Sequence, residues 1–232
     1  MKILSTVALF LSAGALFAQA PDQRLEGRIQ LFAENSRPVA ITVVNSPASL
    51  QDQPKAMTGV GIRFMGEIAS APNWYYEVGG RLDASSNFTL NGPIGGGNSL
   101  DLTAVSVSSS YWSLGAAYII RPVDALSLGL HLEGRGEALS AKGTVYQSLG
   151  GGAWTTVGTT DVSTTYLRPW VRASVDYAFA MGTRRPYVGF DVSAAITRTE
   201  QTQFVSLNLM DNRTLKSLAP NFAFAFYVGA RF

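Results

Sequence analysis

The chain has 232 residues, with 18 basic and 16 acidic side chains, one histidine and no cysteine. This nearly balanced charge argues against a nucleic-acid partner, and without cysteine an exported protein cannot rely on disulfides for stability. No apolar run after residue 20 approaches the twenty or so residues of a transmembrane helix. If the mature chain sits in a membrane, it must do so as a closed sheet, which satisfies every backbone polar group in lipid.

Residues 1–20 have the three parts of a secretory signal peptide. Lys2 is followed by an apolar stretch over 3–17, and residues 18–20 (Ala-Gln-Ala) place small side chains at the −3 and −1 positions. A single membrane anchor helix is the alternative, but the stretch is short for a span and polar residues interrupt it. We therefore predict export through the Sec pathway, cleavage after Ala20, and one mature domain over 21–232.

Alternation of apolar and polar side chains with period two predicts β-strands, because successive side chains point to opposite faces. The pattern is weaker in the first segment, and the fourth continues upstream from Leu114 towards Leu100, although its alternation blurs around Val105–Ser110. Pro169 is awkward in a strand because it cannot donate to a ladder, so we expect a bulge or a later start to the pairing there. The eight segments are about Leu25–Glu34, Val60–Ala69, Trp74–Ala84, Leu114–Ile120, Ala125–Leu139, Leu167–Phe179, Val188–Ile196 and Phe222–Phe232.

The connections between these segments alternate in length. Short ones are expected at Ser70–Asn73, Arg121–Asp124 and Met181–Pro186, and long ones at about Asn35–Thr58, Ser85–Ser99, Ser140–Thr160 and Gln201–Asn221. Short turns on one side and long loops on the other are typical of outer-membrane barrels. The predicted fold is therefore all-β: an eight-stranded antiparallel up-and-down transmembrane β-barrel with short periplasmic turns and long extracellular loops.

Alternation alone does not decide whether the apolar faces meet lipid or a soluble core, as in a lipocalin-like barrel. The apolar faces stay free of charge for about ten residues, roughly the length of a tilted transmembrane strand. Aromatic residues also gather near the short turns, as in an interfacial girdle. These features favour lipid outside and a polar lumen inside. The predicted lumen charge network consists of Arg63, Glu67, Glu77, Arg81, Asp83, His131, Glu133, Arg135, Arg172, Asp176 and Asp191.

The C-terminal segment carries an expected assembly signal. Phe224, Phe226, Val228 and Phe232 share one face of the last predicted strand. The pattern resembles the C-terminal signal of bacterial outer-membrane proteins, in which a terminal aromatic residue follows apolar residues at every second position. The resemblance implies two partners, the barrel-assembly machinery and the lipid bilayer of the outer membrane.

The chain as a whole resembles the small OmpA/OmpX-type outer-membrane barrels. The resemblance rests on the eight-strand pattern, on the turn Arg121-Pro122-Val123-Asp124 before Ala-Leu-Ser-Leu-Gly-Leu, and on the segment Pro186-Tyr187-Val188-Gly189. It implies the fold and a location in the bacterial outer membrane. It does not determine the function, since that family includes anchors, adhesins, weak pores and lipid-modifying enzymes.

Three functions remain open at this point. The first is a non-enzymatic barrel that presents surface loops for structural or interaction roles, and the second is a narrow passive channel lined by the lumen charges. The third is a lipid-modifying enzyme built on His131, with Ser127, Glu133 and Glu137 on the same strand face. Parity directs His131 into the lumen and away from lipid, which favours a non-enzyme. No cofactor, metal or oligomeric state is predicted.

Overall fold

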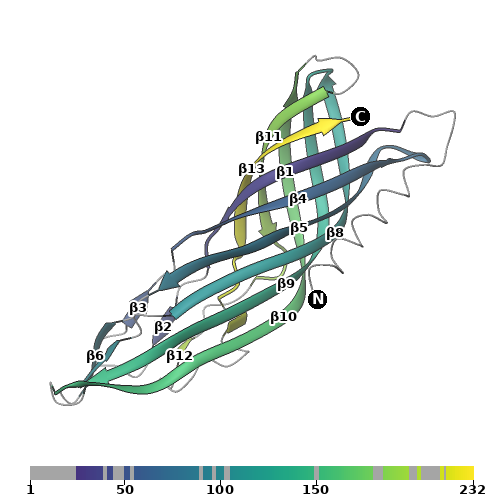
Figure 1. Cartoon of the computed structure of the whole chain (residues 1–232). Helices are drawn as coiled ribbons and strands as arrows, with labels where there is room; N and C mark the ends of the chain where they lie inside the picture. Colours follow the sequence, from purple (N-terminus) through teal and green to yellow (C-terminus); the bar gives the residue numbers. More distant parts are fainter. Residues whose placement is uncertain are drawn as a thin grey trace, which may run out of the picture.

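The computed structural model describes residues 25–38, 41–43, 50–52, 55–88, 91–95, 98–101, 105–148, 152–179, 185–198, 203–204, 215–216 and 218–232 (Figure 1). The predicted signal peptide over 1–20 lies outside these residues. Eight strands of the ten-stranded main sheet build the barrel wall: β1 (Gly27–Ser36), β4 (Met57–Ile68), β5 (Ala71–Phe88), β8 (Val105–Val123), β9 (Leu126–Ser148), β10 (Trp154–Ala178), β11 (Arg185–Ala195) and β13 (Phe222–Arg231).

These eight strands close into a barrel. Their order is β10-β11-β13-β1-β4-β5-β8-β9, and the additional pairing of β10 with β9 joins the two ends of the sheet. Every neighbouring pair of barrel strands is antiparallel. The predicted eight-stranded antiparallel barrel is therefore confirmed. Among the described residues, no helix is long and apolar enough to cross a membrane.

The two ends of the barrel differ. At the turn end, tight turns at 69–70 and 124–125 join β4 to β5 and β8 to β9, and strand β1 begins beside the last residues of β13. At the opposite, loop end, the chain forms the short strands β2 (Ile41–Val43), β3 (Leu50–Asp52), β6 (Asn91–Gly95), β7 (Asn98–Asp101) and β12 (Gln203–Phe204). Strands β2, β3 and β12 form a separate three-stranded sheet.

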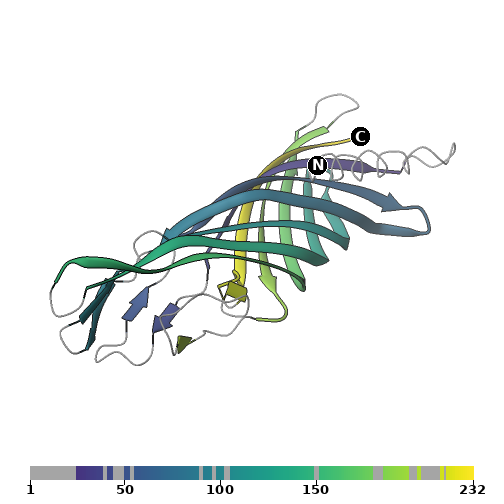
Figure 2. The same cartoon turned by 60° about the horizontal axis from the view of Figure 1, so that its bottom comes forward.

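Strands β9 and β10 extend much farther than the sequence pattern predicts, whereas the length of β8 agrees with the expected continuation upstream of Leu114. β8 has 19 residues, β9 has 23 and β10 has 25, whereas β11 has 11. Figures 1 and 2 show these strands reaching well beyond the loop ends of β11 and β13. The predicted long loop over Ser140–Thr160 is therefore wrong in most of its length, because residues 140–148 lie in β9 and residues 154–160 lie in β10. Its Ser and Thr residues suit a solvated sheet, in which neither face has to be apolar.

Pro169 lies within β10, opposite Gly134 of β9, with no register shift at this point. Its carbonyl accepts a hydrogen bond from the amide of Ile196, so its backbone groups face the side of β11. Strand β11 ends at Ala195, which is the partner of Trp170. The pairing of β10 with β11 therefore starts at Trp170, one residue after Pro169, which agrees with the expected later start to the pairing, and no bulge is present there.

The outer wall of the barrel is apolar. Leu31, Val60, Leu114, Leu130 and Phe226 expose 57–63% of their surfaces, and the polar residues that alternate with them are buried. Aromatic pairs lie near the turn end, where the ring centroids of Trp74 and Tyr118 are 5.3 Å apart. A large exposed apolar band around a polar interior is the arrangement of a barrel that meets lipid.

Candidate functional site

The lumen is filled by buried charges from several strands, and its centre is an ionic cluster around Arg172 of β10. The guanidinium of Arg172 donates to both carboxylate oxygens of Glu77, from β5. It also lies 3.4 Å from Asp191 of β11, which accepts a 2.6 Å hydrogen bond from Arg63 of β4. These side chains are almost completely buried, with exposed fractions of 0–2%. We call this group, with His131 and Glu133, the central cluster.

A second group of charges lies toward the loop end. Glu34 of β1 accepts hydrogen bonds from Arg81 at 2.9 Å and from the hydroxyl of Tyr111 at 2.6 Å. Arg135 of β9 lies 3.5 Å from the same carboxylate and also donates to Glu133 at 2.6 Å. Arg135 therefore links Glu34 to the central cluster.

A third group closes the turn end. Asp176 of β10 pairs with Arg28 of β1 at 3.1 Å and accepts a hydrogen bond from Arg231 of β13. The hydroxyl of Ser127 accepts a 2.6 Å hydrogen bond from Arg231. Each isolated buried ion would be very costly, so these cross-lumen pairs are a condition for folding.

Nine of the predicted network residues lie buried in the lumen: Arg63, Glu77, Arg81, His131, Glu133, Arg135, Arg172, Asp176 and Asp191. Glu67 is half-buried at the turn end, where it accepts a hydrogen bond from the amide of Glu26. The prediction for Asp83 is wrong, because its side chain is exposed. A register shift between Arg81 and Ala84 reverses the parity of β5, so that Ala84 is buried and Asp83 points outward.

Several lumen charges were not included in the prediction. They are Arg28, Glu34, Glu137, Arg168 and Arg231, all with 5% exposure or less. Arg168, Arg231 and Glu137 stand at inward positions of predicted strands, so parity alone could have found them. Arg28 and Glu34 belong to the weaker first segment, in which they alternate with the apolar residues Ile29, Leu31 and Ala33, so the same parity argument could have found them.

His131 contacts Glu77 and Ser174 in the central cluster, and Ser127 belongs to the turn-end group instead. Its Nδ1 lies 2.8 Å from Glu77 Oε2, and its Nε2 lies 2.8 Å from the hydroxyl of Ser174. Gly129 makes room for this contact, since a Cβ there would lie 2.5 Å from the Ser174 oxygen. The hydrogen bonds therefore connect Ser174, His131 and Glu77 in the same order as in a serine–histidine–acid triad.

Arg172 weakens the chemical likeness to a triad. A triad needs Nδ1–H to donate to the carboxylate, which leaves Nε2 free to accept the serine proton. Arg172 Nη2 lies 2.9 Å from Nδ1 and also donates to Glu77. The guanidinium thus competes with the imidazole for the carboxylate and favours a proton on Nε2, which would then donate to Ser174. The arrangement suits a structural network better than an activated nucleophile.

The loop end of the lumen is covered by a segment that precedes β13. Leu215 and Leu218 of this segment are buried against Val107, Leu139 and Ala141 of β8 and β9. Arg168 holds the end of the segment, because it donates to the carbonyl of Pro220 at 2.5 Å and to the side chain of Asn221 at 3.1 Å. Arg168 also pairs with Glu137 at 2.9 Å. We call residues 215–216 and 218–221 the cap.

The extended part of β10 has one open edge. β10 pairs with β9 over its whole length, but its pairing with β11 covers only Trp170–Ala178. No described strand pairs with the other edge of residues 159–168. Along β10 the backbone N–H groups point alternately to β11 and to β9. The amide of Phe179 donates to the carbonyl of Pro186 in β11, and the amide of Ala178 donates to the carbonyl of Ala125, just before β9. The odd-numbered residues Ser163 and Thr165 therefore direct their N–H groups to the open edge.

Within the described part of the chain, no group of three or more histidine or acidic side chains could hold a metal ion. The described lumen holds paired charges and aromatic side chains, together with buried apolar residues such as Met65 and Ala117. Guanidinium groups also stack on rings, as Arg135 does on Trp170 with its central carbon 4.1 Å from the ring centre.

Comparison with known proteins gives similarity in fold only. No family model and no curated protein matches the sequence. The chain is similar to the crystal structure of Ail from Yersinia pestis in complex with the heparin analogue sucrose octasulfate, with 13% identity, a TM-score of 0.43, and coverage of 90% of this chain and 100% of that chain. For Neisserial surface protein A the identity is 11%, the TM-score 0.43 and the coverage 88% and 95%. For the outer membrane protein OprG from Pseudomonas aeruginosa the identity is 10%, the TM-score 0.43 and the coverage 89% and 95%. The chain has the eight-stranded antiparallel architecture of small outer-membrane barrels of the OmpA/OmpX kind.

Proposed function

We propose that the protein is a non-enzymatic outer-membrane barrel that is closed to solutes and presents the extended β8–β10 sheet outside the cell. The turn end then faces the periplasm, and the loop end faces the exterior. The observation that carries this proposal is that buried ion pairs lie at three levels of the lumen: Arg28–Asp176 at the turn end, Arg172–Glu77 at the centre and Arg168–Glu137 at the loop end. These pairs fill the barrel where a pore would have to run.

A narrow passive channel is the alternative that the lumen charges raise. Eight strands leave an interior that side chains can just fill, and large ionic residues do fill it. A solute would have to separate pairs such as Arg63–Asp191 at 2.6 Å and then displace the cap at the loop end. Breaking buried pairs costs several kcal/mol each, so we expect no measurable conductance at rest.

A lipid-modifying enzyme is the second alternative, supported by the contact of His131 with Ser174. We disfavour it because Arg172 occupies both the carboxylate and Nδ1, and because the site lies inside the wall. His131→Ala in a strain that lacks the native protein tests this. We expect the membrane lipid profile to be unchanged with a folded barrel, whereas loss of one lipid product would restore the enzyme hypothesis.

The contact surface that we propose is the open edge of β10. An edge strand with unpaired N–H and C=O groups is a template on which an extended segment of another protein can add a strand. Residues 159–168 offer about ten residues of such an edge beyond the loop end of β11. The polar outer row of this part, which includes Asp161, Ser163 and Thr165, keeps the edge soluble until a partner arrives.

Thr165→Pro tests this surface directly, since it removes one N–H that faces the open edge and none that faces β9. Pro169 shows that β10 accepts proline at this parity. Cells that display the variant should adhere several-fold less than wild type to wells coated with serum protein. The matched control Thr165→Val retains the N–H and should adhere normally. Equal adherence of the proline variant and wild type would contradict the proposed edge.

We also propose that the chain is exported through the Sec pathway and inserted by the barrel-assembly machinery, which would recognise the C-terminal strand. Phe226, Val228 and Phe232 present 55–63% of their surfaces on the outer face of β13. Phe232 exchanges backbone hydrogen bonds with Gly27 of β1, so the last residue also completes closure of the barrel.

A further inference from the structure

An apolar cluster lies between the cap and the inner face of the extended sheet. Its members on β8 and β9 are buried against Leu215 and Leu218 of the cap, with exposed fractions of 0–1%. Val162 and Tyr166 of β10 pack against the same cluster but are only half-buried. Burial therefore decreases from β8 and β9 to β10, which Figure 1 shows as the outermost strand of the extension.

The register of β10 shows on which side the cluster is open. Val162 lies opposite Ala141 of β9 and Tyr166 lies opposite Glu137, and both of these β9 residues are buried. On the other side the pairing with β11 begins only at Trp170, so no described strand covers Val162 or Tyr166 there. The apolar cluster is therefore complete toward β9 and open at the edge of β10.

A strand that pairs with this edge places every second side chain beside the cluster. Its inward residues lie opposite Val162, Thr164 and Tyr166. Its outward residues lie opposite Ser163 and Thr165, which are exposed. Aromatic and β-branched side chains are the ones that stabilise such neighbours across a sheet. The edge therefore favours apolar residues on one face of the added strand and polar residues on the other.

We propose that the partner of the β10 edge is an amphipathic extended segment of another protein, with an aromatic residue opposite Tyr166 and a β-branched residue opposite Val162. Its backbone pairs with β10, and its two apolar side chains complete the cluster beside the cap. Main-chain pairing gives affinity for any extended segment, so the inward row is what gives this site its specificity. The inference rests on the proposed function, because it names the side chains of the segment that the open edge binds.

Two fluorescently labelled peptides of nine residues and identical composition test this pattern. Both consist of serine, threonine and lysine with one tryptophan and one valine. In the first peptide the valine follows the tryptophan by four residues, so both face the cluster in antiparallel pairing. In the control peptide they are three residues apart, so one of them must face outward. Fluorescence anisotropy with the refolded mature protein in detergent should give a Kd at least ten-fold lower for the first peptide.

Protein variants locate the binding. Val162→Ser should raise the Kd of the first peptide several-fold and leave that of the control peptide nearly unchanged. Ser163→Ala alters the outward row of the same strand and should bind both peptides as wild type does. Thr165→Pro removes an N–H of the edge and should weaken binding of both peptides. Heat-shifted gel mobility verifies that each variant is folded.

The outcomes separate this inference from the proposed edge. Equal affinities for the two peptides, both weakened in Thr165→Pro, would overturn the proposed side-chain pattern and leave the edge as a contact surface. Binding that Thr165→Pro leaves unchanged would refute the edge itself. A first peptide that does not bind at millimolar concentration would also overturn the inference.

Discussion

At the scale of single residues, the lumen depends on charges that cannot exist there alone. Arg172 contacts Glu77, Asp191 and Glu133 with no exposure of its own side chain. Removal of one member of such a group leaves the others buried without their partner, and that cost exceeds the value of the original pair. The pair Lys142–Asp161 is exposed instead, with about 70% exposure of both side chains, so water can solvate either ion when the other is removed.

Arg172→Met should therefore lower the free energy of unfolding by roughly 3–5 kcal/mol. Lys142→Met should change it by less than about 1 kcal/mol, because water screens an exposed pair. Urea unfolding of the refolded protein in detergent, followed by tryptophan fluorescence, measures both. Similar values for the two variants would show that the central cluster contributes no more than a surface pair.

The alternation of the sequence is enough to place most of these residues correctly. A lumen side chain must alternate with a lipid-facing one, so His131, Arg172 and Asp191 could be assigned inward from the sequence. Asp83 could not, because the irregularity after Arg81 is a backbone feature without a distinct sequence signal. The pairing partners also could not be predicted, since Arg63–Asp191 joins residues 128 apart in the chain.

At the scale of strands, packing between neighbouring backbones limits which residues the wall accepts. A Cβ on Gly115 of β8 would lie 2.3 Å from the carbonyl oxygen of Leu132 and 2.8 Å from Cα of Glu133. Backbone atoms in a ladder cannot move aside cheaply. On the adjoining strand β9, a Cβ on Gly134 would meet nothing closer than 3.8 Å.

Gly115→Ala should thus destabilise the barrel by about 1–3 kcal/mol through overpacking. Gly134→Ala should stay within about 0.5 kcal/mol of wild type. The unfolding measurement used for Arg172 applies to both variants. A neutral Gly115→Ala would mean that β8 and β9 are farther apart than the structure places them.

The last strand makes a separate prediction about assembly. Deletion of Phe232 should reduce the folded barrel in the membrane several-fold, because the proposed signal loses its terminal aromatic residue. Phe222→Ala removes an aromatic side chain from the same outward row, with a similar exposure of 54%, and should assemble nearly as wild type. The heat-shifted fraction in isolated membranes reports assembly. Equal loss of folded barrel in both variants would indicate that assembly depends on the general apolarity of β13 and not on a terminal signal.

Strand positions within the wall could be predicted because lipid on one side and a polar lumen on the other impose the alternation. That constraint ends at the membrane surface. The outer halves of β9 and β10 carry Ser and Thr on both faces, so the pattern over Ser140–Thr160 did not distinguish a strand from a loop. The apolar contact of the cap was equally hidden, since Leu215 and Leu218 meet residues more than 70 positions away.

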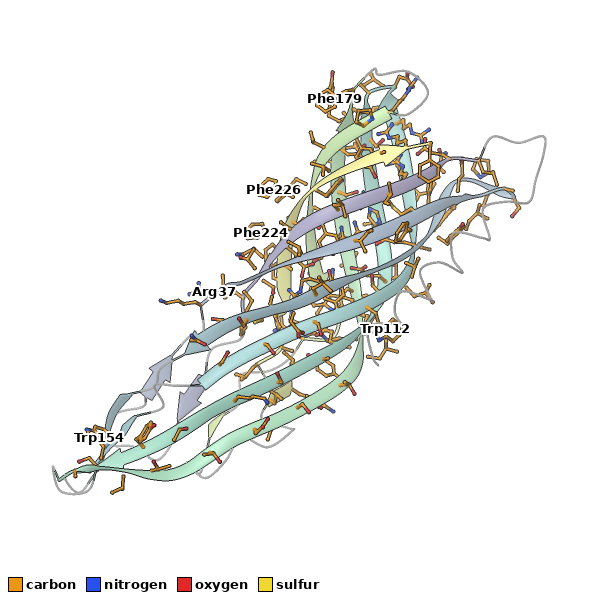
Figure 3. The ribbon with its side chains drawn as sticks, viewed as in Figure 1. Arg37, Trp112, Trp154, Phe179, Phe224 and Phe226 are labelled. Atoms are coloured by element: carbon orange, nitrogen blue, oxygen red, sulfur yellow. The ribbon has the colours of Figure 1, made fainter. Side chains whose placement is uncertain are left out.

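At the scale of the whole molecule, the barrel divides into a closed wall and an asymmetric exterior. β8, β9 and β10 carry a sheet outward on one side, with its open edge on β10. On the opposite side β1, β4 and β13 have only 10–12 residues and end much earlier (Figures 2 and 3). The proposed contact with another protein therefore uses one side of the exterior.

The central claim is that the lumen is closed by its ion pairs, and single-channel conductance in a planar bilayer tests it most directly. The refolded mature protein, with folding verified by heat-shifted gel mobility, should leave the bilayer silent. Glu77→Gln/Arg172→Gln, measured beside it, shows whether any current passes through the central cluster. Discrete conductance steps in the wild type that change in the double variant would contradict the account and establish the protein as a channel.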